Sequence, residues 1–374
     1  MTIPYVQSSA SQEVPPPYYF PGVTVNAFVW EAQMDRISAY CDRFFNLGST
    51  KERGFVYKPA SAWPYAMLMF MQYPMMICSD DKENVGSEVE YSNRGYVSQA
   101  EVFVAFPVVR YGATAANLVF GTAMEWALPF IVVGNAMSAV CGREMLGLEK
   151  LLADIRMQEG PYPGSFVASV HLPGWPKAGA QQRVTPFLRV STGPELPTYR
   201  GSPAASSIWS LLQSREAGWG IDEVANFANL LGVATAGLAP TGMRTVSLRQ
   251  IRDARDPGKA LYQALMSCVT RYSNVREFRF YNEANVDITF STAGSFGDIL
   301  RLFHDVPANT PGMKHAIEPK AAFRFQADID FGQMLTLHTF PVDRGPRLAP
   351  VPASSNLAAP WARPWLGLLR PERR

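Results

Sequence analysis

Cysteine and histidine are scarce in this chain, which has four of each among its 374 residues. The cysteines, Cys41, Cys78, Cys141 and Cys268, lie far apart and form no CxxC pair. We therefore expect neither a disulfide framework nor a zinc site. The histidines are equally scattered and share no metal-ligand spacing. The sequence thus predicts no metal site.

An excess of charge of one sign is also lacking, since 34 basic and 32 acidic residues give a net charge of +2. Nucleic-acid binding usually needs a basic patch, so we expect no nucleic-acid partner. The N-terminus lacks the basic start and apolar core of a secretory signal. The longest apolar stretch, 118–140, is interrupted by Glu125 and Pro129, which predicts two buried strands joined by a turn and no membrane span. These features predict a cytoplasmic protein.

Hydrophobic residues make up 47% of the chain, and many occur in short runs rich in β-branched and aromatic side chains. Such runs, bounded by turn residues, are typical of strands. The predicted strands are 23–30, 65–78, 101–109, 117–124, 127–133, 165–172, 185–190, 244–249, 262–271, 275–281, 286–290, 323–329 and 336–340. Apolar spacing predicts helices over 31–45 and 136–146, and a short one over 296–303. Many short strands with few helices favour a sandwich or barrel.

We expect a single domain over 1–374, because β-rich domains often run this long. Residues 1–22 are rich in proline and tyrosine, which predicts an extended segment. Residues 197–242 have helical spacing and many alanines, which indicates a helical insertion. The tail, 345–374, is rich in proline and is expected to have little regular structure.

One short motif stands out at the end of the predicted helix over 136–146. Gly142, Arg143 and Glu144 are followed by Lys150, six residues after the glutamate. Upstream, Glu101 opens an apolar strand six residues before Pro107. This combination resembles the acetoacetate decarboxylase superfamily, in which a Gly-Arg-Glu triplet lies on a helix and the lysine that follows forms a Schiff base.

The resemblance has direct consequences for the fold and the site. It implies an α+β fold of mostly antiparallel strands, with a cone-shaped β-barrel, peripheral helices and an apolar cavity. It implies that Lys150 is the nucleophile and Glu101 the proton-transfer group, with Arg143 and Glu144 in binding or supporting positions. Members of the superfamily often form homo-oligomers, so we expect one here.

A lysine nucleophile must be a neutral amine, and burial or a nearby positive charge favours that form. Acetoacetate decarboxylase is itself the standard example of the second route. In members that decarboxylate acetoacetate a second lysine follows the first, but this chain has Leu151 there. Burial must then dominate, and Leu148, Leu151 and Leu152 are expected to supply the apolar setting.

Two further departures bear on the substrate. The end of the first strand reads Trp30-Glu31, without the arginine that suits a substrate carboxylate, and a second family glutamate has no counterpart over 65–72. The preferred interpretation is a cofactor-free Schiff-base lyase acting on a β-oxo acid or related oxo acid. The alternatives are an aldolase–dehydratase or cyclase acting on a larger oxo acid, and a non-catalytic small-molecule binder.

Simpler roles also exist for these residues. A lysine just after a helix complements the helix dipole without any catalytic role. Arg143 and Glu144 could form a structural ion pair, and Glu101 could be an exposed strand end. The sequence by itself does not decide between these roles and catalysis.

Overall fold

The computed structural model describes residues 6, 13–61, 63–78, 96–113, 119–158, 164–174, 180–193, 242–281, 285–291, 300–302 and 314–341. All of them belong to Met1–Pro341, the larger of the two units into which the chain divides. Almost all of the predicted insertion over 197–242, most of the predicted helix over 296–303 and the whole tail over 345–374 lie outside the described residues.

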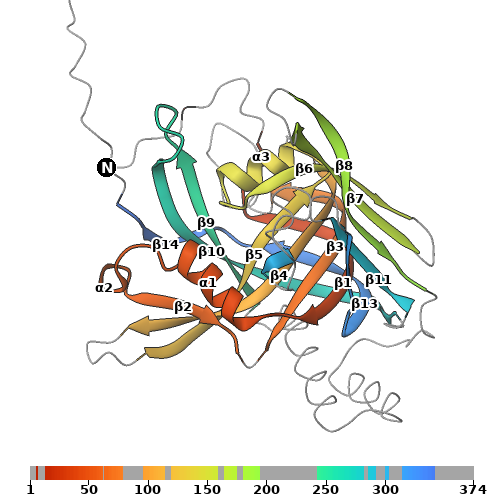
Figure 1. Ribbon diagram of the computed structural model, residues 1–374, viewed down its shortest axis with the longest axis horizontal. Helices are drawn as coiled ribbons and strands as arrows, with labels where there is room; N and C mark the ends of the chain where they lie inside the picture. Colours follow the sequence, from red (N-terminus) through yellow and green to blue (C-terminus); the bar gives the residue numbers. More distant parts are fainter. Residues whose placement is uncertain are drawn as a thin grey trace, which may run out of the picture. The chain divides into compact units, whose positions relative to one another are not determined.

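Strands dominate the described residues, and three short helices accompany them (Figure 1). The helices are α1 (Met34–Phe44), α2 (Thr50–Arg53) and α3 (Ala136–Glu144). The strands are β1 (Tyr18–Glu31), β2 (Phe55–Pro59), β3 (Tyr65–Cys78), β4 (Val97–Ala113), β5 (Val119–Val133), β6 (Lys150–Met157), β7 (Ser165–Gly174), β8 (Ala180–Ser191), β9 (Met243–Arg252), β10 (Ala260–Phe280), β11 (Asp287–Ser291), β12 (Lys314–Ile317), β13 (Ala321–Phe331) and β14 (Leu335–Thr339). Among these residues, no helix combines the length and apolar character needed to cross a membrane.

All fourteen of these strands belong to one sheet, and seven of them close on themselves in the order β5-β9-β10-β13-β1-β3-β4. The ring closes because β4 also pairs with β5. Every neighbouring pair in it is antiparallel except β5–β9. The predicted mostly antiparallel β-structure is confirmed. Of the predicted cone-shaped barrel, the structure shows this closed ring of pairings.

The sheet forks along β5. Residues 125–127 of β5 pair with β9 and complete the ring, whereas residues 131–133 pair with β6. From β6 an arm continues through β7, β8, β11 and β12. The predicted break into two strands near 125–126 is wrong, because β5 runs unbroken through Glu125 and Pro129. Proline is tolerated here since Pro129 lies between the two pairings, at a register shift against β4.

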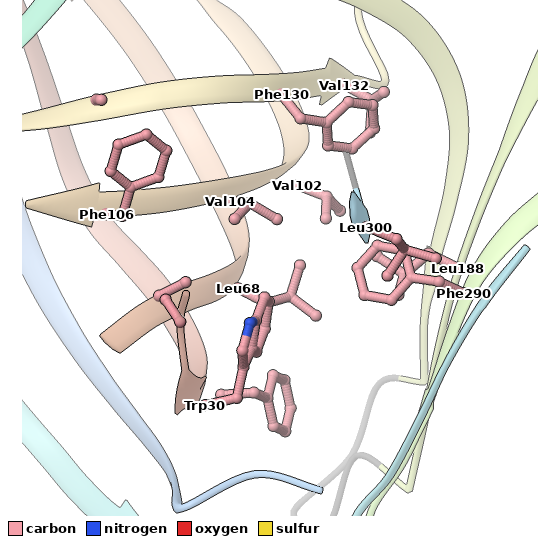
Figure 2. Packing of buried hydrophobic residues seen from close by; sticks show 14 of the residues in the cluster. Trp30, Leu68, Val102, Val104, Phe106, Phe130, Val132, Leu188, Phe290 and Leu300 are labelled. Carbon is pink, nitrogen blue, oxygen red and sulfur yellow. The ribbon is translucent and has the colours of Figure 1, made fainter. Parts of the chain in front are cut away.

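Alternating side chains separate two cores. Residues on one face of β1, β3, β4 and β5 point into the ring, and those on the other face pack against the arm. Figure 2 shows part of this outer core, including Trp30, Leu68, Val102, Val132 and Leu188. The core inside the ring includes Val25, Met69, Ala105 and Ile131. The arm therefore covers the outer face of the ring, and a site can form among the side chains inside the ring.

Candidate active site

Glu101 lies inside the ring because of its position on β4. Its neighbour Val102 is fully buried in the outer core, so the period of two turns Glu101 inward. The glutamate pairs with Met71 of β3 on one side and with Val133 of β5 on the other. It is 7% exposed, which shows that it is not a solvated strand end.

Lys150 reaches the same place from the first position of β6. It pairs with Ile131 of β5, whose side chain also lies inside the ring. Its Nζ is 2.6 Å from Glu101 Oε2 and 3.3 Å from Ser138 Oγ. The lysine and glutamate side chains are 8% and 9% exposed. The structure thus brings together the two residues that the sequence singled out, 49 positions apart, as a buried pair.

Helix α3 supports the lysine from one side. The Asn135 side chain caps the helix by accepting hydrogen bonds from the amides of Met137 and Ser138, at 2.9 and 3.3 Å. Ser138, Cys141 and Gly142 are the buried residues of α3, at the i, i+3, i+4 spacing that places side chains on one face. This face lines the cavity that holds Lys150.

The lysine stem passes directly over Gly142. A Cβ at this position would lie 2.5 Å from Lys150 Cδ and 2.8 Å from Cε, closer than carbon atoms approach. The glycine of the Gly-Arg-Glu triplet therefore leaves room for the lysine. Gly147, which ends the turn before Lys150, has φ +67 and has the backbone of Arg249 against it, so a side chain is excluded there too.

Two tyrosines border Glu101, and neither of them was singled out from the sequence. Tyr73 Oη lies 3.4 Å from Glu101 Oε1. Burial first, and then the negative charge of Glu101, raise the pKa of Tyr73 and of Tyr272. Both phenols therefore stay protonated and available as hydrogen-bond donors. The clue in the sequence was the odd-numbered position of Tyr73 on β3, which shares the inward face with Met71.

The pair lies in a cavity inside the ring. The volume open to the centre of a water molecule is about 90 Å³, several times what one water needs. Most of the lining is apolar, with methionines from β3 and aromatic rings from β1, β4 and β13. The lining side chains include Phe20, Met67, Met69, Met71, Met76, Phe103, Trp126, Leu128, Leu148, Met243 and Phe331. The polar side chains in the lining include Gln99, Ser138, Thr245 and Thr270.

The other predicted residues lie outside this cavity. Arg143 is exposed, and its Nη1 donates to the backbone carbonyl of Lys150 at 3.3 Å, so it contacts the chain behind the lysine. Glu144 is exposed and is not among the lining residues. The predicted apolar setting is partly wrong. Leu148 lines the cavity, but Leu151 and Leu152 are 43% and 50% exposed, and the methionines of β3 take their place.

A second buried carboxylate lies away from this cavity, on β5. Glu125 is fully buried and accepts a 2.5 Å hydrogen bond from Tyr57, while Arg110 Nη2 is 3.2 Å from its other oxygen. Burial raises its pKa, and the bond from Tyr57 and the charge of Arg110 oppose that shift. Within the described residues, no group of three or more His, Cys, Asp or Glu side chains is placed to hold a metal ion.

No protein-family model matches the chain, and a search of curated proteins gives no match. Solved structures do match. Acetoacetate decarboxylase from Legionella pneumophila aligns with a TM-score of 0.51 and 10% identity, covering 91% of this chain and 93% of that chain. A second acetoacetate decarboxylase structure and the enduracididine biosynthesis enzyme MppR complexed with pyruvate both give a TM-score of 0.47 and 12% identity. They cover 89% and 88% of this chain and 93% of their own.

The chain therefore has an acetoacetate decarboxylase-like fold, as the motif around Lys150 predicted. At 10% identity this likeness concerns the fold. Unrelated activities share folds, so the function has to be argued from the site.

Proposed function

We propose that the protein is a Schiff-base lyase acting on an oxo acid, with Lys150 as the nucleophile and Glu101 as the proton-transfer group. The observation that carries this proposal is the 2.6 Å contact between Lys150 Nζ and Glu101 Oε2 inside an apolar cavity. An amine with a carboxylate at hydrogen-bond distance has the partner that its deprotonation requires.

Glu101 first accepts a proton from Lys150, which leaves a neutral amine. The proton passes along the 2.6 Å contact between Lys150 Nζ and Glu101 Oε2, and the product is a neutral pair inside a largely apolar cavity. The amine then attacks the ketone carbonyl of the substrate. Loss of water from the resulting carbinolamine, with Glu101 returning its proton to the leaving hydroxyl, gives an iminium ion on Lys150.

Decarboxylation follows from the charges in the cavity. In a β-oxo acid the bond between the α-carbon and the carboxylate breaks, its electron pair moves into the iminium, and carbon dioxide and a neutral enamine result. This step removes both charges, and an apolar cavity favours it because neither charge is well solvated there. A proton from water then adds to the enamine carbon and re-forms an iminium ion. The hydroxide that is left adds to this iminium, and collapse of the carbinolamine releases the ketone and the free amine of Lys150.

A second function is favoured by one observation. Of the described residues that line the cavity, only Lys150 and Glu101 carry charged side chains, so no arginine or second lysine holds a substrate carboxylate. In the superfamily that the motif resembles, members that decarboxylate acetoacetate carry both groups. An aldolase–dehydratase on a larger oxo acid uses the same enamine to attack an aldehyde and does not release carbon dioxide. The two reactions share the Schiff base and diverge after it.

Borohydride trapping tests the proposal. The protein is reduced in the presence of β-oxo acids and pyruvate-type acids, and peptide masses locate the adduct. We expect a reduced adduct on Lys150 that lacks the mass of carbon dioxide when the substrate is a β-oxo acid. An adduct that retains the carboxylate, followed by consumption of an added aldehyde, would favour the aldolase.

Two variants complete the test. Lys150→Ala should abolish the adduct, whereas Lys259→Ala should leave it unchanged, because Lys259 lies in the turn between β9 and β10 and its side chain is 60% exposed. If no oxo acid gives an adduct on Lys150, the protein is not a Schiff-base enzyme. Binding of small apolar ligands without any adduct would then identify a carrier on the same fold.

A further inference from the structure

The cavity has a distinct chemical character beyond its reactive pair. The two charged groups among its lining residues, Lys150 and Glu101, already face each other. A second carboxylate or a phosphate on the substrate would lie against methionine and aromatic surfaces without a cation. Burying an unpaired charge costs several kcal/mol, which disfavours dicarboxylic and phosphorylated substrates.

One wall of the cavity is made of methionines. Met67, Met69 and Met71 occupy alternate positions of β3 and therefore face the same side, and Met76 and Met243 add to the lining. Methionine side chains are unbranched, polarizable and able to adopt many rotamers. Such a wall fits flexible aliphatic groups of different lengths better than one rigid polar shape.

Two leucines close this cavity on another side. Leu128 of β5 and Leu148 line both the reactive cavity and a second cavity, so they lie between the two. The second cavity has a mixed lining, with apolar side chains such as Phe45 and Leu248 beside the polar Glu149 and Ser247. Trimming either leucine would extend the space that is open to a substrate.

From these features, and resting on the proposed Schiff-base function, we propose that the substrate is a 3-oxo acid with an aliphatic chain beyond the ketone. The aliphatic chain of the substrate packs against the methionine wall, and Leu128 and Leu148 limit the length of chain that fits. The carboxylate finds its counter-charge in the iminium that forms on Lys150. Loss of carbon dioxide and hydrolysis then give a methyl ketone that carries the same aliphatic chain.

The test is a chain-length series of straight 3-oxo acids from four to twelve carbons, with spontaneous decarboxylation subtracted. Carbon dioxide release gives kcat/KM, and borohydride trapping with the matching methyl ketones gives a second readout that needs no decarboxylation. We expect kcat/KM and adduct yield to rise by up to about fourfold for each buried methylene. Both should then level off or fall once the cavity is full.

Leu128→Ala should move this limit to longer chains, and the exposed Leu152→Ala, on β6, should not. If the four-carbon acid or a 3-oxo acid with a terminal second carboxylate is the best substrate, the chain proposal is wrong and the Schiff-base function stands. If Lys150 forms no adduct with any member of the series or with other oxo acids, the function itself fails. If the dependence of kcat/KM on chain length is unchanged in Leu128→Ala, that leucine does not limit the length of the substrate.

Discussion

Replacing Gly142 with alanine should damage catalysis far more than stability. The new Cβ would lie 2.5 Å from Lys150 Cδ, 2.8 Å from Cε and 3.0 Å from Cγ. Ordinary contacts between carbon atoms are about 3.5–4 Å, so the lysine stem must move by about 1 Å. Its Nζ would then leave the position 2.6 Å from Glu101. A displacement of about 1 Å of a catalytic group typically lowers the rate about 100-fold.

Stability should change little, because two effects oppose each other. Alanine is a better helix former than glycine by about 1 kcal/mol, and overpacking costs about 1–3 kcal/mol. The Lys150 side chain, which ends at the cavity, can relieve part of the overlap. Denaturant unfolding would measure the stability, and borohydride trapping or decarboxylation would measure the activity.

Gly134→Ala is the matched control, since its new Cβ would meet its nearest atom, the Ala100 carbonyl oxygen, at an ordinary 3.6 Å. It should keep its activity. Full activity in Gly142→Ala, at unchanged stability, would refute the view that the lysine needs its present position. A protein that fails to fold would contradict the expected small change in stability and would show that the packing around Lys150 needs the glycine.

Three further variants test the fold around the site. Burial raises the pKa of Glu125, so the folded state binds more protons than the unfolded state once the pH exceeds about 4.3. The free energy of unfolding should therefore fall as the pH rises above that value. Denaturation of Glu125→Gln at a series of pH values should lack this fall. Asn135→Ala removes the cap of α3 and should lower the free energy of unfolding, measured in urea, by about 1 kcal/mol. An unchanged free energy of unfolding would mean that other contacts hold the start of the helix. Leu68→Ala in the outer core should cost about 2–5 kcal/mol, whereas Leu152→Ala, 50% exposed, should change stability by less than about 0.5 kcal/mol.

Much of the site could be predicted because it depends on local patterns. The period of two along β4 turns Glu101 and Phe103 to one face and Val102 and Val104 to the other, and this alternation is visible in the sequence. The predicted helix over 136–146 and the position of Lys150 just after it also agree with α3 and β6. The resemblance then connected two segments that no periodicity could have joined.

What could not be predicted depends on pairing between distant strands. Pro129 signals a break in a single strand, but in the structure it lies where β5 changes partner from β9 to β6. Tyr272 approaches Glu101 because β10 belongs to the same ring, and Arg143 turns to the backbone of Lys150 because of the tight turn after α3. Each of these arrangements depends on the closed ring or on the turn after α3, and local sequence propensities do not predict either of them.

A final prediction separates catalysis from structure as the reason for the buried pair. Replacing a buried ion pair by apolar residues is often neutral or stabilising, whereas removing one partner costs about 3–5 kcal/mol. We therefore expect Lys150→Met alone to destabilise the protein, and the double variant with Glu101→Leu to recover most or all of the loss.

Both variants should be inactive in borohydride trapping, and denaturant unfolding of the four proteins in the cycle gives the coupling energy. A double variant much less stable than the wild type would mean that the Lys150–Glu101 contact holds the ring together. Recovered stability without activity would mean that the fold does not need the pair, because apolar side chains like those of the surrounding methionine wall would serve it equally well. The two charges would then be present in the cavity for their chemistry.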